Sequence, residues 1–168
     1  GGIFLDNSNA VVFNCGPECG GTAASVAVVN IQTGAVTATI PVRGATTGLL
    51  SGSNTLYVAG TPPGTGCGSG TQAQSCGTLD VVNLLTTTST QAPNAITDGY
   101  HNLMQMGANG QLFIGARGCT NLTASNNSQG EVRGCLSIYN TSTSAVTVPP
   151  AQGNVTGIEP ITGRAVVY

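Results

Sequence analysis

Six cysteines are the residues of this chain whose type and spacing most clearly carry chemistry. Local pairs of thiols form disulfides in an oxidising compartment or bind zinc. One pair resembles half of a zinc site, but the spacings of the other two do not fit one, and the chain has a single histidine. Disulfides are therefore favoured, and no metal site is predicted. The pairs are Cys15/Cys19, Cys67/Cys76 and Cys119/Cys135.

One other cluster brings titratable groups together. Asp98-Gly99-Tyr100-His101 contains a carboxylate, a phenol and the sole histidine. Such a set can supply a general base or a metal ligand. A polar turn in which His101 is hydrogen-bonded or solvated is the simpler interpretation and is favoured. The sequence has no nucleophile elbow, phosphate-binding loop or His-Glu-x-x-His motif, so the chain is expected not to be an enzyme, with no catalytic residue and no cofactor.

Four Asn-x-Ser/Thr sequences are candidate acceptors of N-linked sugars. A chain this rich in Asn and Thr produces such matches by chance. The two that fall in a long polar loop are the best candidates, because an acceptor must lie on a surface loop. The candidate sites are Asn121 and Asn126, in that loop, and Asn140 and Asn154 elsewhere.

Charge excludes several classes of partner. Of the 168 residues 6% are charged, none of them is lysine, and the net charge is −2. No basic patch can therefore neutralise a row of nucleic-acid phosphates or attract the chain to anionic lipid. No apolar run approaches the roughly 18 residues that a membrane span needs. Neither nucleic acid nor a membrane span is expected. No leader peptide opens the sequence, so we expect either that a signal has been cleaved or that the N-terminus is missing from this sequence.

The elements that position these residues repeat along the chain. A short apolar strand begins near residues 11, 56, 112 and 166. In the first three units a cysteine pair follows or closes this strand, and a later strand ends in Asn-x-x-Thr. An Asn at a strand end accepts backbone N–H groups from the residues ahead, so a structural role is expected for Asn30, Asn83 and Asn140. The aligned strands are Val11-Val12-Phe13, Leu56-Tyr57-Val58 and Leu112-Phe113-Ile114.

The repeat selects one connectivity for the cysteines. Each pair occupies the same slot between the second and third strands of its unit, so each is predicted to close that loop. The loops are short, and each bond is expected to contribute at most about 2–3 kcal/mol. An extracellular or cell-surface location follows, with the periplasm as an alternative. The predicted bonds are Cys15–Cys19, Cys67–Cys76 and Cys119–Cys135.

Nearly all-β structure is expected, because β-branched residues occur in compact alternating runs. Each unit is expected to contain four strands. Asn109-Gly110 predicts a tight hairpin, since both residues tolerate positive φ. The expected strands are 3–5, 10–14, 25–30 and 35–42 in the first unit, 47–50, 55–60, 78–83 and 87–91 in the second, 103–106, 111–116, 135–140 and 145–148 in the third, and 155–158 and 165–168 in a fourth.

The first unit resembles the YVTN-type β-propeller repeat. The resemblance rests on Val26 to Val36, which reads Val-Ala-Val-Val-Asn-Ile-Gln-Thr-Gly-Ala-Val, and on Thr39-Ile40-Pro41-Val42. Leu56-Tyr57-Val58 matches the Leu-Tyr-Val strand of that family, and Leu112-Phe113-Ile114 matches it less closely. This chain departs from the family in three ways: it has Asn for the usual Asp before the last turn, longer units, and paired cysteines.

The resemblance implies one segment of consecutive four-stranded antiparallel blades. A propeller closes with roughly 4–8 blades, so the chain is expected to be part of a larger propeller, either as a piece of a longer polypeptide or completed by further copies. Of these two alternatives, a piece of a longer polypeptide is favoured. The implied blades are about 2–43, 44–94 and 95–150, with a partial blade at 151–168, within the single segment 1–168.

A non-catalytic extracellular scaffold or binding module is the expected function. The loops between second and third strands differ most among the units, and function tends to gather on such loops. The partner would be a protein, a polysaccharide or another copy of the chain. A subunit of an extracellular fibre or surface layer is the first alternative, because unpaired strand edges invite association. The second is a lactonase-like hydrolase, whose acidic and histidine residues around a central channel cannot be placed here.

Overall fold

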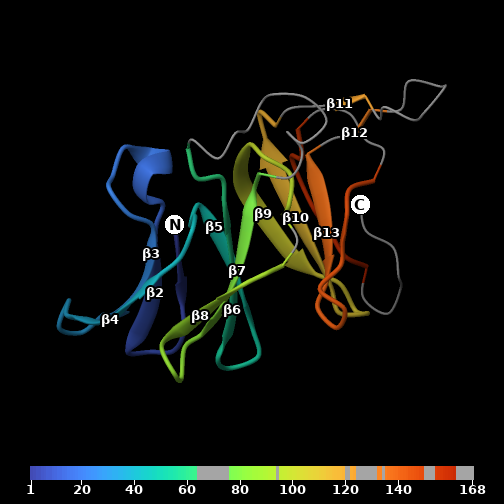
Figure 1. Cartoon of the computed structure of the whole chain (residues 1–168). Coiled ribbons are helices and arrows are strands. Elements are labelled where there is room, and N and C mark those ends of the chain that lie inside the picture. Colours follow the sequence, from blue (N-terminus) through green and yellow to red (C-terminus); the bar gives the residue numbers. More distant parts are fainter. Residues whose placement is uncertain are drawn as a thin grey trace.

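The chain folds into β-sheets. The computed structural model describes residues 1–63, 76–93, 95–119, 122–123, 132–133, 135–149 and 154–161. These residues form strands, turns and one short 3₁₀ helix, η1 (Gly16–Cys19), and no α-helix occurs among them. Three four-stranded antiparallel sheets follow one another along the chain, from blue to orange in Figure 1. The all-β prediction is confirmed.

Within each sheet the strands pair in the order in which the chain makes them. Each strand of these three sheets overlaps a predicted strand. The first sheet contains β1 (Gly2–Phe4), β2 (Asn9–Asn14), β3 (Ser25–Asn30) and β4 (Val36–Pro41). The second contains β5 (Thr47–Ser51), β6 (Thr55–Gly60), β7 (Thr78–Asn83) and β8 (Thr88–Gln91). The third contains β9 (Tyr100–Met106), β10 (Gln111–Arg117), β13 (Leu136–Asn140) and β14 (Val146–Thr147).

Two parts of the chain differ from expectation. The connection from β10 to β13, expected as a loop, contains the paired strands β11 (Leu122–Thr123) and β12 (Val132–Arg133). Residues 155–158, expected as a strand, form none in the described structure. A strand needs a neighbour for its backbone groups, and the Val155 N–H instead donates to the Ala116 carbonyl at the end of β10 (3.0 Å). The strand expected at 165–168 lies outside the described residues.

The strand register corrects the repeat alignment of the first unit by one residue. The strand-end asparagines pair with Asn9, Thr55 and Gln111 in the three sheets. Val11 is therefore equivalent to Tyr57, and the predicted match of Val11 to Leu56 is wrong. The error would place each side chain of the strand on the wrong face of the sheet, because a shift of one residue exchanges the two faces of a strand.

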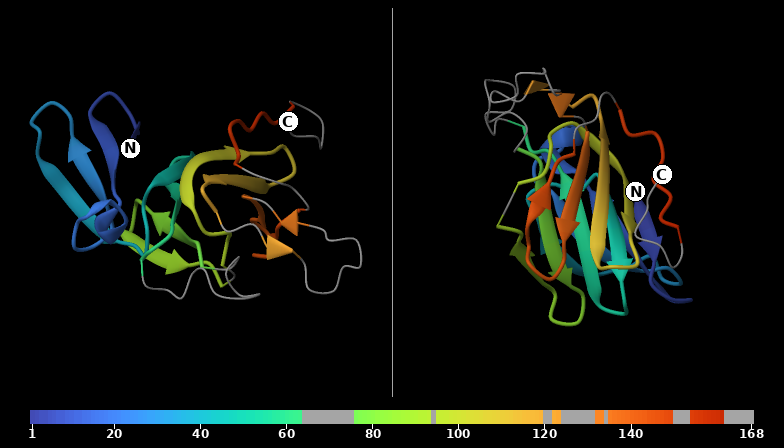
Figure 2. Two further views of the ribbon diagram at one scale, coloured as in Figure 1. Left: turned by 90° about the horizontal axis from the view of Figure 1, so that it is seen from above. Right: turned by 90° about the vertical axis from the view of Figure 1, so that its right-hand side faces the viewer.

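The sheets pack face to face through two cores. Figure 2 shows them side by side in chain order. The second sheet buries both faces, which explains why β6 is apolar at consecutive positions from Leu56 to Ala59. The core between the first and second sheets contains Val11, Phe13, Val26, Ile40, Leu56, Val58 and Val82. The core between the second and third contains Tyr57, Ala59, Leu79, Met104, Leu112, Ile114 and Tyr139.

The turn after the third strand of each sheet has the same construction. Asn30 Oδ1 accepts the N–H groups of Gln32 (3.1 Å) and Thr33 (3.0 Å). Asn83 and Asn140 accept the N–H groups two and three residues ahead in the same way. The predicted structural role of the three asparagines is confirmed.

The hairpin predicted at Asn109-Gly110 is present, although only Gly110 has a positive φ (74°). The Gly110 N–H donates to the Gly107 carbonyl (3.3 Å), so Asn109 is the third residue of the turn and Gly110 the fourth. This placement suits a type I turn followed by one left-handed glycine, for which Asn109 keeps a negative φ.

Candidate functional site

The two ends of the sheets carry different connections. We call one end the loop end; there the second strand of each sheet ends and the third begins, and the connections between them are residues 15–24, 61–77 and 118–135. The opposite end, with the tight turns between the other strands of each sheet, is the turn end. In Figure 1 η1 lies at the same end of the sheets as β11 and β12, on the opposite side of the molecule from them. Loops gathered at one end of a rigid scaffold are the usual place for function.

Two of the three predicted disulfides are present, and both close loops at the loop end. Cys15–Cys19 spans η1, with the Cα atoms 5.7 Å apart. Cys119–Cys135 joins the end of β10 to the start of β13, with the Cα atoms 5.6 Å apart. Of the third pair, Cys67 lies outside the described residues. The two observed bonds indicate an oxidising environment.

The η1 loop depends on a glycine. Gly16 has a φ of 57°, and a Cβ at this position would lie 2.4 Å from the Ala23 carbonyl carbon and the Ala24 nitrogen. Only glycine allows the returning chain to come so close in this conformation. The loop is therefore compact, and it directs Glu18 toward the second sheet.

Glu18 links the first loop to the second sheet. Its Oε2 accepts the N–H of Thr61, the first residue after β6 (2.9 Å). Burial raises the pKa of Glu18, and the hydrogen bond from Thr61 opposes that shift without cancelling it. A half-buried carboxylate thus attaches the Cys15–Cys19 loop to its neighbour.

Thr61 continues the link to the third sheet. Its hydroxyl donates to the Gly99 carbonyl, just before β9 (2.8 Å), and lies 3.5 Å from His101 Nδ1. Glu18, Thr61 and Gly99 therefore connect three consecutive sheets at the loop end. We call this set the loop-end chain.

His101 lies within strand β9, so its predicted place in a polar turn is wrong. The strand begins at Tyr100, earlier than expected, with a register shift opposite Gly115 and Ala116. The His101 side chain is fully buried, and its Nε2 has no hydrogen-bond partner among the described residues. Burial lowers the pKa of His101 to about 4, although the Thr97 backbone and the Asp98 charge oppose the shift. The ring is therefore neutral at pH 7 and does not face solvent.

An ion pair that the sequence did not predict lies below the loop end. Arg43 follows β4, and Asp80 is a buried residue of β7. Arg43 Nη2 and Nε both contact Asp80 Oδ1 (2.7 and 2.8 Å), and the Arg43 N–H donates to Asp80 Oδ2 (2.7 Å). Nη2 also donates to the Leu79 carbonyl (2.7 Å). The linker between the first two sheets is thereby fixed to the second.

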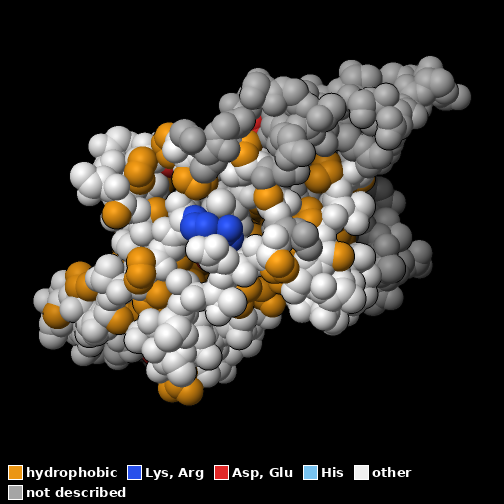
Figure 3. Space-filling view, viewed as in Figure 1, with side chains coloured by type: hydrophobic (Ala, Val, Ile, Leu, Met, Phe, Trp, Pro, Cys, Tyr) orange, Lys and Arg blue, Asp and Glu red, His pale blue; other side chains and the backbone are white. Residues whose placement is uncertain are grey.

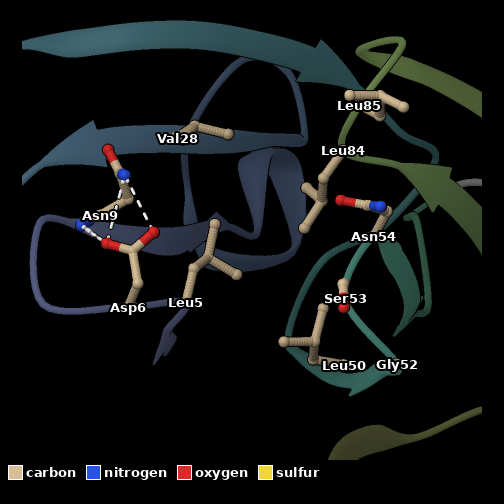
Figure 4. A pocket seen from close by; sticks show the side chains of 10 residues that line it. All are labelled: Leu5, Asp6, Asn9, Val28, Leu50, Gly52, Ser53, Asn54, Leu84 and Leu85. Carbon is tan, nitrogen blue, oxygen red and sulfur yellow. Dashed lines mark hydrogen bonds between the residues drawn. The ribbon is translucent and has the colours of Figure 1, made fainter.

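A hollow of about 570 Å³ opens at the turn end between the first and second sheets (Figure 4). Its walls are partly apolar and partly polar. The lining residues come from segments far apart in the sequence, so no sequence motif predicted the hollow. The lining residues are Leu5, Asp6, Asn9, Val28, Leu50, Gly52, Ser53, Asn54, Leu84 and Leu85.

The carboxylate in this hollow is engaged in its own turn. Asp6 Oδ1 accepts the N–H groups of Ser8 (2.6 Å) and Asn9 (2.8 Å), and the Asn9 side chain lies against it in Figure 4. The Asn9 side chain and the Ser8 N–H lower the pKa of Asp6. These bonds explain the shape of the turn without a ligand.

The candidate glycosylation sites differ in their surroundings. Asn140 is half-buried and holds its turn, as described above. Asn154 is exposed, and its Oδ1 accepts the Gly118 N–H (2.7 Å). Asn121 and Asn126 lie outside the described residues. Use of any of the four remains a prediction.

Uncharged groups dominate the face of the molecule drawn in Figure 3. Figure 3 shows scattered hydrophobic side chains among white polar and backbone atoms, with little charge. Within the described residues no three His, Cys, Asp or Glu side chains come together in a way that could hold a metal ion. That part of the chain also lacks any helix long and apolar enough to cross a bilayer.

Comparison with known proteins adds no family assignment. No family model matches this chain, and a search of curated proteins finds no match. The similarity to YVTN-type repeats therefore remains a hypothesis that rests on the residues themselves.

Proposed function

We propose that the chain is a non-catalytic extracellular binding module built from consecutive blades of a β-propeller. Each sheet has the same strand order and packs on the next through one face. The first strands of consecutive sheets lie beside one another, β1 beside β5 and β5 beside β9. In a propeller the first strands of the blades surround a common axis, and this arrangement supports the proposal. The chain would then supply part of a larger ring.

The contact surface in this proposal is the loop end. The observation that carries it is the loop-end chain, in which Glu18, Thr61 and Gly99 hold three sheets in register beneath their loops. Disulfides close two of those loops. A surface that is ordered before binding loses less conformational entropy when a partner docks.

The chemistry of the chain favours an uncharged, hydrogen-bonding partner. With only 6% charged residues, the surface offers hydroxyl, amide and backbone groups. These groups suit the hydroxyls of a polysaccharide or the polar rim of a protein interface. An extracellular location belongs to the proposal because it agrees with the two disulfides.

Binding assays on the purified chain test this function. Insoluble chitin, cellulose and xylan and an array of soluble glycans and extracellular proteins serve as probes. We expect a ligand whose affinity falls at least tenfold when Cys119 and Cys135 are both replaced by Ala. The matched control is Leu85→Ser at the turn end, which should bind like the wild type.

Three outcomes would overturn the proposal. The first is no binding to any probe. The second is a ligand that Leu85→Ser loses and the disulfide variant keeps, because that result would place the site at the turn end. The third is turnover of a lactone or ester panel that His101→Gln abolishes, because the chain would then be a hydrolase.

A further inference from the structure

The hollow at the turn end has an apolar floor and a largely polar rim. Its floor is formed by Leu5, Leu50 and Leu84, which pack against the core between the first two sheets and surround the open space in Figure 4. Leu85 adds an apolar side chain to the rim and is 76% exposed. The volume of about 570 Å³ lies within the range of roughly 300–1,000 Å³ that small-molecule sites have. The polar residues of the rim are Asp6, Asn9, Ser53 and Asn54.

The repeat does not require the residues that give this hollow its character. Strand register and the turn hydrogen bonds give the equivalent positions in the other sheets. The turns there form with small or polar uncharged residues, so neither an acid nor an exposed leucine is needed to build such a turn. The equivalents are Ser51 and Gly107 for Leu5, Gly52 and Ala108 for Asp6, and Gln32 and Ser142 for Leu85.

Asp6 is the one charged residue among those that line the hollow. Its Oδ1 accepts the N–H groups of Ser8 and Asn9, which fixes the carboxylate in its turn. Its Oδ2 accepts only the Asn9 side-chain N–H among the described residues (3.1 Å), although an ionised carboxylate has about four acceptor sites. The bonds from Asn9 and Ser8 lower the pKa of Asp6, so the group is charged at pH 7. A fixed anion with spare acceptor capacity thus lies beside an apolar floor.

We propose that the hollow binds a small aliphatic amine, whose ammonium group donates to Asp6 Oδ2 and whose hydrocarbon chain covers the leucine floor. The charge on Asp6 favours a cation over an uncharged or anionic molecule of the same shape. Because Asp6 is exposed, the ion pair contributes modestly, and burial of the hydrocarbon supplies the remaining affinity. No arginine lines the hollow, so no cationic side chain among the lining residues competes for the carboxylate.

An NMR titration of the intact chain at pH 7 tests the proposal. The probe is pentylammonium chloride, and pentan-1-ol and sodium pentanoate are its uncharged and anionic counterparts. We expect pentylammonium to shift the backbone amides of Leu5, Asn54 and Leu85 saturably, with a dissociation constant of about 1–10 mM. Amides at the loop end should not move. Pentan-1-ol should bind at least threefold more weakly and pentanoate at least tenfold. Added salt should weaken pentylammonium alone, because it screens exposed charges.

Three variants separate the charge from the apolar surface. Asp6→Asn keeps a side-chain oxygen for the turn and removes the charge, so the dissociation constant of pentylammonium should rise to that of pentan-1-ol. Leu85→Ser should weaken pentylammonium and pentan-1-ol alike, by about threefold. Glu159→Gln removes an exposed acid outside the hollow and is the matched control, which should bind like the wild type. Circular dichroism and Tm should stay near those of the wild type in all three.

Several results would overturn the proposal. One is the absence of saturable shifts at the hollow up to ten times the expected dissociation constant. Another is equal affinity for pentylammonium and pentan-1-ol, or a folded Asp6→Asn variant that binds pentylammonium like the wild type, because charge would then play no part. If Nα-acetyl-lysine N-methylamide binds at least tenfold more tightly than pentylammonium, the hollow receives a lysine side chain of a partner protein and is not a small-molecule site. None of these results bears on ligand binding at the loop end.

Discussion

Asp80 and Ser137 occupy the same position in consecutive sheets, and each accepts the backbone N–H of the linker that leads into its own sheet. The Arg43 N–H donates to Asp80 Oδ2 (2.7 Å), and the Thr97 N–H donates to Ser137 Oγ (2.9 Å). Both acceptors are buried. A polar side chain inside the third strand therefore forms the joint between one sheet and the next.

Replacing Asp80 by Ala should destabilise the protein strongly. The change leaves the Arg43 guanidinium and N–H without their carboxylate, and breaking a buried ion pair costs about 3–5 kcal/mol. We expect about 2–4 kcal/mol because Arg43 is partly exposed. Urea unfolding measures the loss. Ser137→Ala is the matched change in the third sheet, where the linker bonds to an uncharged side chain, and it should lower the free energy of unfolding by only about 1 kcal/mol. Equal losses at the two positions would contradict a role for charge.

Thr87→Gly should stabilise the second sheet. Gly34, Thr87 and Ser144 hold the same turn position, all with positive φ (71°, 52° and 60°). This conformation costs an L-residue about 1–2 kcal/mol, and a β-branched side chain suits it poorly. After the greater chain entropy of glycine is subtracted, a gain of about 0.5–1 kcal/mol is expected. Thermal unfolding measures it, and Gly34→Thr should give a loss of similar size. A lower Tm for Thr87→Gly would show that the backbone of Thr87 is not strained in the folded protein.

Local patterns predicted most of the fold because the information is local. Alternating β-branched residues placed the strands, and the Asn-x-x-Thr signature placed the turns whose hydrogen bonds the structure contains. The register of β2 was missed for a local reason too. Val11-Val12-Phe13 is apolar on both faces, so residue type alone could not align it with Leu56-Tyr57-Val58.

The candidate site was less predictable because its contacts join distant segments. Glu18 and Thr61 are 43 positions apart, and Arg43 and Asp80 are 37 apart. One feature of the repeat could have predicted the ion pair of Asp80. Asp80 is a lone acid in an apolar strand, at the position of Ala27 and Ser137, and a buried carboxylate there requires a partner. For His101 the polar neighbours suggested a turn, whereas the strand pairing with β10 buries the ring.

Acid should destabilise the fold through His101. Its pKa falls from the ordinary 6.5 to about 4 in the folded state, so the unfolded chain binds more protons between these values. The contribution of the neutral ring is fully present above pH 6.5 and is lost as the pH falls toward 4. Urea midpoints at pH 7, 6, 5 and 4 measure this slope, which should flatten in His101→Gln. An NMR titration that places the His101 pKa near 6.5 would contradict the buried neutral ring.

The two disulfides should differ in their contribution to stability because they close loops of different length. Cys119–Cys135 has a sequence separation of 16 and Cys15–Cys19 one of 4. On the loop-entropy account, removing the longer closure costs about 3 kcal/mol and removing the shorter about 2 kcal/mol. Paired Cys→Ala variants, compared by urea unfolding, measure both.

The shorter loop also carries Glu18, so the Cys15/Cys19 variant should additionally lose the coupling of Glu18 to Thr61 across the first two sheets. A double-mutant cycle that combines this variant with Glu18→Ala measures the coupling energy. If Glu18→Ala costs as much without the Cys15–Cys19 bond as with it, the disulfide does not position the carboxylate, and the loop-end chain depends on Gly16 and the η1 backbone alone.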